Sequence, residues 1–405
     1  MIVLIFPLAI VIRGVHLFRP MRTGRLFIGL HEIANIIQSV SDCLSERNIC
    51  VHALIISSGR YGIKNIRTHK NLHVQWHQPN GRLNATVFEL SLPFRLIREI
   101  IRNDTFLFVW NRSFMPLSVD YFFLRLAGKR LVLMHCGDDV RYRPMQRVID
   151  AEFGHKSWPY DEARPYHFLR SFYYQTLSET VASVISHPDQ STFQTGPLFP
   201  FRFPQRTLID AGKKSSVCPL ILHCPSDRIV KRTDIVLKAI DHLREEGLKF
   251  EFELIENSNN EYVLERMKIV DIVVDQPGVW VARLAIEAMA AGCCVVGGNR
   301  SAYMQRFDSP VIQFESDPNQ LAAALKELIV DYEFRQKKMN ECFEFWKSNY
   351  SYEAYAKYFN NVIDGTAPTF MPRPNQKQLL IKGASSWFER AMIQLFYCPK
   401  TVVNR

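Results

Sequence analysis

The sequence predicts an α/β chain of two doubly wound domains that face a cleft, and three observations support this fold class. At 405 residues the chain exceeds one ordinary hydrophobic core, so two domains of roughly 150–200 residues each are expected. Short apolar runs alternate with helix-length segments in both halves, which is typical of βαβ units around buried parallel sheets. Between the halves, residues 196–216 hold three prolines and two glycines, and the alternation restarts after them.

The predicted elements follow the chain in that alternating order. In the first half we expect strands at 25–30, 51–57, 72–76, 106–110, 130–136 and 181–186, with helices over 32–47, 93–103 and 117–127. In the second half we expect strands at 219–224, 250–256, 270–275 and 293–297, with helices over 233–246 and 259–268 and one that ends at Gly292. Thr233 is the expected cap of the helix over 233–246.

The predicted domain limits follow from these elements. An N-terminal extension over 1–20 precedes a first domain over 21–205, and a second domain covers 206–349. Residues 331–364 look helical and amphipathic, and the part over 350–365 is expected to return to the first domain. A tail over 366–405 follows.

The N-terminal segment admits three interpretations. Its apolar run over 2–12 is too short to span a bilayer, and no basic residue precedes it. It is a short membrane anchor, a poor signal sequence, or a stretch before a start at Met21, and we favour the last. Nine cysteines without C-x-x-C pairs indicate reduced thiols in a cytoplasmic protein, and no metal site is expected.

Charge is distributed unevenly along the chain. The formal net charge is +10, and the whole excess lies in residues 1–206, which hold 25 Lys+Arg against 15 Asp+Glu. That half can therefore face an anionic membrane surface or a polyanionic acceptor, or it is simply a soluble basic surface. In the segment 90–104, arginines lie beside Phe94, Ile97 and Ile101, as in a helix on anionic lipid or one that covers a sheet. No nucleic-acid-binding module is recognisable, so no nucleic-acid partner is expected.

Two sequence features can carry chemistry in the second half. Arg228 and Lys231 lie on a strand-to-helix turn, where free N–H groups and two cations suit a diphosphate, although an exposed basic turn fits as well. Glu287 lies early in the helix that ends at Gly292, where it complements the helix dipole or accepts hydrogen bonds from vicinal ribose hydroxyls. The small residues over 288–292 allow close packing of that helix on its sheet.

Taken in order, the segments PSDRIVKRTDIVLKAI, FEFELIE, VDIVVDQ and AIEAMAAGCCVV resemble the donor half of family 4 glycosyltransferases of the GT-B fold, over about residues 218–300. The resemblance implies two Rossmann-like domains and a retaining, metal-independent and cofactor-free enzyme. That enzyme would transfer a sugar from a nucleotide-diphosphate donor to a saccharide or lipid-linked acceptor in polysaccharide or glycoconjugate synthesis. With the basic first half considered as well, we expect a cytoplasmic protein that can lie peripherally at the inner face of the membrane. The resemblance also implies that Arg228 and Lys231 hold the diphosphate, that Glu287 holds the ribose, and that Asp275 belongs to the donor site.

The first half is similar to the same family in two places. HEIANIIQ places Asn35 at the loop before the first helix, where an acceptor or the donor phosphates are expected. LVLMHCGDDVRYR resembles the family's strand and its His-Gly-Asp-Arg loop, which implies that His135 faces the cleft and orients the donor sugar as the catalytic residue. Asp138, Asp139 and Arg141 would contact acceptor or order that loop; alternatively, Asp139 and Arg141 form a local structural pair.

The chain departs from the family pattern at Val279, where members usually have a second Glu eight positions before the ribose-binding one. Arg283 is a candidate replacement charge. Two alternatives to a transferase therefore stay open. One is a nucleotide-sugar epimerase on the same fold, which would use carboxylates such as Asp138, Asp139 and Asp275. The other is a non-catalytic relative that binds a saccharide.

Overall fold

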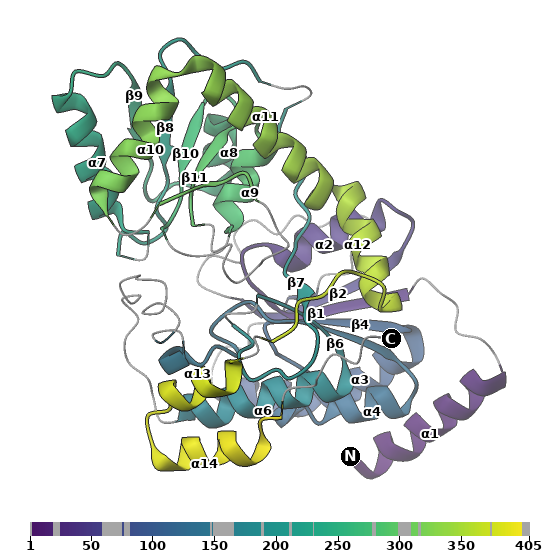
Figure 1. The fold of residues 1–405 in the computed structure, drawn as a ribbon. Coiled ribbons are helices and arrows are strands. Elements are labelled where there is room, and N and C mark those ends of the chain that lie inside the picture. Colours follow the sequence, from purple (N-terminus) through teal and green to yellow (C-terminus); the bar gives the residue numbers. More distant parts are fainter. Residues whose placement is uncertain are drawn as a thin grey trace. The chain divides into compact units, whose positions relative to one another are not determined.

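The structure, a computed structural model, divides into two compact units, each built on a parallel sheet (Figure 1). It describes residues 2–18, 25–58, 75–76, 82–145, 148, 166–187, 190–209, 213–229, 231–277, 281–298, 309–314, 317–372 and 375–398. Unit 1 contains the described residues up to Met145, then 166–203 and those from Ala356 onward. Unit 2 is built mainly from Pro204–Tyr355.

Unit 1 has a seven-stranded sheet in the order β3-β2-β1-β4-β5-β6-β7, and every pairing in it is parallel. The strands are β1 (Arg25–Glu32), β2 (Cys50–Ser58), β3 (Gln75–Trp76), β4 (Thr105–Val109), β5 (Arg130–Met134), β6 (Ser183–Ser186) and β7 (Phe199–Pro200). The central strands are buried on both faces, because helices cover both sides of the sheet. The order reverses between β1 and β4, which makes this a doubly wound sheet.

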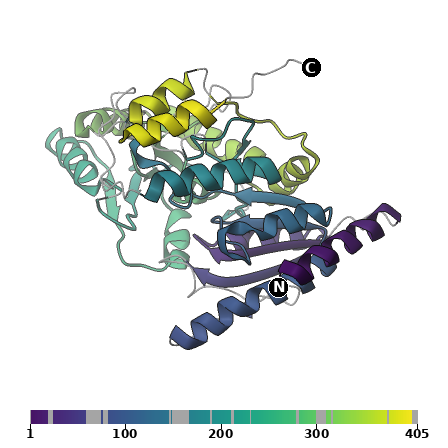
Figure 2. The same ribbon diagram turned by 90° about the horizontal axis from the view of Figure 1, so that it is seen from below.

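Helices cover both faces of this sheet. The helix α2 (Ile36–Ser45) packs on β1 and β2 from one face, and α3 (Arg82–Arg102), α4 (Asp120–Leu126) and α6 (Tyr166–Val181) lie on the other (Figure 1). The short 3-10 helix η1 (Pro116–Ser118) precedes α4. The N-terminal helix α1 (Ile2–Phe18) packs on α4 and buries Ala9 in the same core; Figure 2 views the molecule from this helical side.

The predicted start of α3 near residue 93 is wrong. The helix begins eleven residues earlier, at Arg82, and Pro93 lies inside it. A proline in a helix interior removes one backbone hydrogen bond. Burial of Phe88 and Leu92 upstream of the proline, together with Leu96 downstream, holds the helix across that gap.

Unit 2 has a five-stranded parallel sheet in the order β12-β11-β10-β8-β9. The strands are β8 (Leu220–His223), β9 (Glu251–Leu254), β10 (Ile272–Val274), β11 (Cys294–Gly297) and β12 (Ile312–Gln313). The helices are α7 (Thr233–Glu245), α8 (Asn260–Met267), α9 (Arg283–Ala290), α10 (Pro318–Val330) and α11 (Tyr332–Asn349). Alternate residues of β10 and β11 join a core with α7 and α10, so this sheet is doubly wound as well.

Helix α9 ends as the sequence predicts. Gly292 has a φ of +70°, and Cys293 donates its N–H to the carbonyl of Ala288 at 2.9 Å, which closes the last turn. A Cβ at Gly292 would also lie 2.8 Å from the Ile209 side chain. Glycine is therefore required here both for backbone conformation and for space.

The chain returns to unit 1 along α12 (Tyr352–Asp364), which follows α11 after a break at Tyr350 and Ser351. Arg202 stacks on the Tyr358 ring at 4.8 Å, and the Tyr358 hydroxyl donates to the Pro200 carbonyl. Two further helices, α13 (Gln376–Gly383) and α14 (Trp387–Phe396), then pack on unit 1, where Glu389 accepts a 2.6 Å hydrogen bond from Tyr142. Among the described helices, none combines the length and the apolar character needed to cross a bilayer.

Candidate functional site

Each unit has one point where its strand order reverses, and ligands of doubly wound sheets bind beyond the strand carboxyl ends at such points. In unit 2 this point lies between β8 and β10, because the chain goes from β8 to β9 at one edge and then back across β8 to β10. In unit 1 it lies between β1 and β4. These two places are therefore the first candidates for a functional site.

Lys231 and Asp275 form an ion pair at the reversal point of unit 2. The Lys231 ammonium lies 2.6 Å from a carboxylate oxygen of Asp275. Only 11% of the lysine side chain and 3% of the aspartate side chain are exposed. The two residues follow β8 and β10, so the strand order brings together side chains that lie 44 positions apart.

His223 holds this region together at the end of β8. Its Nδ1–H donates to the Val274 carbonyl at 2.9 Å, and its Nε2 accepts from the Thr233 hydroxyl at 3.1 Å. Burial lowers the pKa of His223 to about 4, so the ring is neutral, as these two contacts require. Thr233 was expected to cap α7. The cap position is instead Arg232, in a left-handed conformation, and Thr233 is the first residue inside the helix, with its hydroxyl bound to His223.

Arg228 lies on the same turn but binds another strand end. Its Nε and Nη2 donate to the two carboxylate oxygens of Glu256 at 2.6 and 2.5 Å. Glu256 follows β9, so this fork joins the β8–α7 turn to the β9–α8 loop. The arginine is more than half exposed, which leaves it accessible to a ligand.

Glu287 is buried, with 3% of its side chain exposed, and two neighbours hold its carboxylate. Arg283 donates to Oε1 at 2.8 Å from one turn earlier, and the Asn260 amide lies 3.3 and 3.4 Å from the two oxygens. The prediction that Glu287 complements the helix dipole at the start of α9 is wrong. The helix begins at Arg283, so Glu287 lies in its second turn, beyond the reach of the unpaired N–H groups.

One half-buried thiol, Cys224 at the end of β8, lies within electrostatic reach of Glu253, Asp275 and Glu287. Burial and the negative charge of these three carboxylates together raise the pKa of Cys224 to about 12. The predicted donor residues Asp275 and Glu287 therefore lie around one point of unit 2. Asn260 and Glu256 are additions that sequence reasoning missed, and their position after β9 was the signal that could have found them.

Unit 1 carries polar and aromatic side chains at its own reversal point. Glu32 is buried and accepts hydrogen bonds from the N–H groups of Ile37 and Gln38, at 3.2 and 3.1 Å, so its carboxylate occupies the start of α2. Asn35, predicted to lie near an acceptor, is the left-handed residue before that helix, with φ of 58°. Its side chain makes no capping hydrogen bond.

An aromatic pair joins the ends of β1 and β4. The ring of His31 stacks on the ring of Trp110 with 5.5 Å between centroids. The backbone N–H of Trp110 donates to the backbone carbonyl of Met134. Burial and the nearby charge of Arg112 lower the pKa of His31 to about 4. Trp110 has a φ of 61°, which is rare and strained for a bulky residue.

His135 does not face a cleft, and the prediction that it does is wrong. The side chain is completely buried, and both ring nitrogens bind serine hydroxyls, Ser191 at 2.7 Å and Ser178 at 3.1 Å. Because Ser178 donates to the Tyr174 carbonyl, it accepts from His135 Nε2–H, and Ser191 donates to Nδ1. Burial lowers the pKa of His135 to about 3, so the ring is neutral and positions the end of β5.

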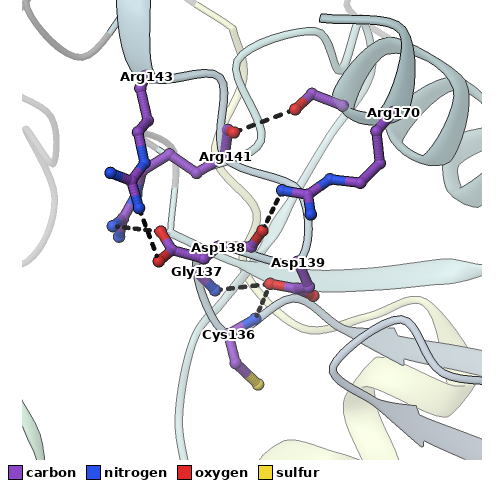
Figure 3. A network of polar contacts seen from close by, with 8 residues as sticks. Cys136, Gly137, Asp138, Asp139, Arg141, Arg143 and Arg170 are labelled. Carbon is purple, nitrogen blue, oxygen red and sulfur yellow. Dashed lines mark hydrogen bonds and ion pairs between the residues drawn. The ribbon is translucent and has the colours of Figure 1, made fainter. Parts of the chain in front are cut away.

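The loop after β5 holds the other three predicted residues of unit 1, shown in Figure 3. Asp139 orders the loop, because its Oδ1 accepts from the N–H groups of Cys136 and Gly137 at 3.2 and 2.8 Å. Asp138 lies 3.3 Å from Arg141 and 3.1 Å from Arg143. The structure thus pairs Arg141 with Asp138 rather than with Asp139, and it adds Arg143 and Arg170 as further partners of Asp138.

The departure predicted at Val279 cannot be placed against this geometry, because Val279 lies outside the described residues. Arg283, the candidate replacement charge four positions later in the sequence, pairs with Glu287. Among the described residues, no group of His, Cys, Asp or Glu side chains is arranged to hold a metal ion.

No protein-family model matches the chain, and no curated protein matches it in sequence. Solved structures do match in three dimensions. One is Alr3699/HepE of Anabaena in complex with UDP and glucose, at 12% identity and a TM-score of 0.51, covering 85% of this chain and 100% of that one. A glycosyltransferase of Rickettsia africae matches at 9% identity and a TM-score of 0.54, covering 85% and 99%.

A third match is the UDP-forming α,α-trehalose-phosphate synthase of Burkholderia vietnamiensis, at 9% identity and a TM-score of 0.52, covering 84% of this chain and 100% of that one. Identities this low establish a common fold and nothing finer. The predicted fold class, two doubly wound Rossmann-like domains of the GT-B type, is confirmed.

Proposed function

We propose that this chain is a glycosyltransferase that moves a sugar from a nucleoside-diphosphate donor to a saccharide or lipid-linked acceptor. The observation that carries the proposal is the Lys231–Asp275 pair at the reversal point of unit 2, with Arg228 and Glu287 on neighbouring strand ends. A nucleotide in a doubly wound sheet binds at that place. UDP is the first nucleotide to test, because the Anabaena structure contains UDP and the Burkholderia enzyme is UDP-forming.

In this proposal each donor residue has one task. Lys231 and the accessible Arg228 neutralise the negative charge that grows on the diphosphate as the sugar leaves. Asp275 holds the lysine ammonium in place, and Glu256 holds the guanidinium. Glu287 accepts from the ribose hydroxyls through its Oε2, which within the described part of the chain contacts only Asn260, at 3.4 Å.

Retention of configuration, metal independence and a place in polysaccharide synthesis belong to this proposal through the resemblance to family 4 enzymes. An epimerase would need a carboxylate available for proton transfer in elimination chemistry. Asp138 is paired with arginines, Asp139 with backbone N–H groups and Asp275 with Lys231, so these contacts favour the transferase.

The test is a panel of UDP-, GDP-, ADP- and dTDP-sugars, with release of nucleoside diphosphate as the readout and product analysis without acceptor. We expect one nucleotide class to bind and to be turned over by hydrolysis or transfer. Binding without turnover would favour a non-catalytic relative, and an epimerised sugar would favour the epimerase. Failure to bind any nucleoside diphosphate would refute the nucleotide-sugar proposal.

We also propose that unit 1 docks on an anionic membrane through the outer face of α3. Val87, Leu90, Phe94 and Ile101 are 59–63% exposed and fall on one helix face, opposite the buried Leu92 and Leu96. Arg98 and Arg102 are exposed on or beside that face. An apolar stripe with flanking arginines fits a surface of acidic lipids. This exposed face of α3 supports a peripheral membrane protein, and the nine free cysteines support a reducing compartment such as the cytoplasm.

The Phe94→Ser variant tests the docking surface. Losing one buried aromatic side chain costs about 1.5–3 kcal/mol, so binding to phosphatidylglycerol vesicles should weaken about tenfold or more in a sedimentation assay. Ile269→Ser, which removes an exposed apolar side chain from unit 2, is the matched control and should leave binding unchanged. Equal binding of the parent and Phe94→Ser, or no binding of the parent, would contradict the proposal.

A further inference from the structure

Three arginines gather around one residue in the loop that follows β5 (Figure 3). Arg141 and Arg143 each lie near one carboxylate oxygen of Asp138, at 3.3 and 3.1 Å. Arg170, which projects from α6, donates to the backbone carbonyl of Asp138 at 2.5 Å. All three guanidinium groups belong to unit 1, so this cluster is independent of the donor residues of unit 2.

Arg141 and Arg170 alone bring two positive charges to Asp138, which offers one carboxylate and is itself about half exposed. The carboxylate faces Arg141 and Arg143, whereas Arg170 reaches only the backbone carbonyl. The neighbouring Asp139 adds little negative charge, because burial raises its pKa to about 7 and it is partly protonated near neutral pH. The excess positive charge reaches further, since Arg141 helps burial to lower the pKa of His187 to about 3.

The cluster also has unused hydrogen-bond donors. Among the described residues, the buried Nε–H groups of Arg141 and Arg170 have no acceptor. A buried donor without an acceptor costs free energy that an incoming oxyanion would recover. Gly137, which has a φ of +139°, places no side chain against the Arg141 guanidinium, and a Cβ there would lie 3.6 Å from that group.

We propose that Arg141, Arg143 and Arg170 bind an oxyanion, and that this oxyanion is a phosphate or carboxylate group of the acceptor. Guanidinium groups bind both anions through paired N–H donors. The donor diphosphate is already matched by Lys231 and Arg228 in unit 2, so a second cationic site in unit 1 points to a second anionic substrate. The acceptor assignment rests on the proposed glycosyltransferase function, whereas the anion site itself does not.

In this proposal Arg141 and Arg143 exchange the Asp138 carboxylate for the oxygens of the bound anion. Asp138 holds two of the arginines in a fork while the site is empty, and the ligand oxygens replace or join that carboxylate. Asp138 therefore competes with the ligand, whereas Asp139 only orders the loop backbone. A neutral sugar offers no charge to the three guanidinium groups and should bind poorly here.

The test is calorimetric titration of the full chain with inorganic phosphate, with glucuronate and with glucose. Each titration is repeated on Lys231→Met, which removes the donor-site cation, so that anion binding to unit 2 is recognised. We expect phosphate or glucuronate to bind and glucose not to bind. Binding of phosphate alone identifies a phosphorylated acceptor, and binding of glucuronate alone identifies a uronic acid.

Variants then assign the binding to the three arginines. Arg143→Gln should weaken the bound anion about tenfold, through loss of one charge-assisted contact. Arg244→Gln is the matched control, because Arg244 also pairs with a nearby aspartate, Asp241, but on the surface of unit 2. Asp138→Asn should tighten anion binding, since it removes the competing carboxylate, and circular dichroism checks that each variant is folded.

The proposal is overturned if neither anion binds more tightly than glucose, or if Arg143→Gln and Asp138→Asn both leave anion affinity unchanged. These outcomes are separable from failure of the glycosyltransferase proposal. The anion titrations need no turnover, and the nucleotide-sugar panel needs no anion subsite in unit 1. A chain that turns over a nucleotide sugar but binds no anion through Arg143 retains the first proposal and loses the second.

Discussion

Lys231→Met should reduce turnover of the accepted nucleotide sugar by about 10²–10³-fold, the loss seen when one preorganised electrostatic donor is removed from a transition state. The ammonium of Lys231 is held 2.6 Å from Asp275, almost out of solvent, so its charge is fixed before the leaving diphosphate develops. A methionine fills a similar volume without charge. Steady-state kinetics with the donor found in the nucleotide-sugar panel measures the effect.

The same substitution also tests stability, because it leaves the Asp275 carboxylate buried without a counter-charge. Breaking a buried pair in this way costs about 3–5 kcal/mol of unfolding free energy. The double variant Lys231→Met/Asp275→Asn removes both charges and should recover much of that stability in urea unfolding while turnover stays low. If the double variant also recovered turnover, Lys231 would be a structural residue and its proposed role in catalysis would be wrong.

Glu287→Ala should weaken nucleoside-diphosphate binding about 100-fold. Two hydrogen bonds from ribose hydroxyls to a carboxylate are worth about 1.5 kcal/mol or more each, and the alanine loses both. Thermal shift and calorimetry with the accepted nucleotide measure the change. Glu265→Ala is the matched control. Glu265 is exposed on α8 and pairs with Lys268 at 2.7 Å, so its loss should leave nucleotide affinity unchanged.

A further variant separates ribose binding from a purely structural role of Glu287. Arg283→Ala removes the guanidinium that occupies Oε1 and leaves the carboxylate in place. Nucleotide affinity should then be kept, because the ribose contact uses Oε2. If Glu287→Ala bound nucleotide as well as the parent, the carboxylate would serve only to tie α9 to Asn260 at the start of α8.

Much of the fold could be predicted from the sequence, because strands and helices are specified by patterns that extend over only a few neighbouring residues. The strands over 105–109, 130–134 and 272–274 are short buried apolar runs, and their composition alone distinguishes them from the amphipathic helices between them. The end of α9 was equally local, since a left-handed glycine stops a helix wherever it lies. The helix α3 was predicted too short, because a proline is a local signal that burial of Phe88 and Leu92 overrides.

The candidate site was only partly predictable. Lys231 and Asp275 were found as separate residues of a resembled motif, and the sequence did not reveal that they form a pair. Their contact depends on β8 lying next to β10, which is a property of strand order. Glu256 and Asn260 were missed because they act through Arg228 and Glu287, residues of other loops.

Local sequence patterns were enough to predict the alternation of strands and helices, the division into two sheets and several of the charged residues at the strand ends. Which of those residues are exposed and which are buried became visible only in the folded chain. His135 was assigned to a cleft because it follows a strand, yet Ser178 and Ser191, 43 and 56 positions away, enclose it. The reason is physical: propensity and periodicity act over a few residues, whereas burial and pairing depend on groups that meet only after the chain has folded.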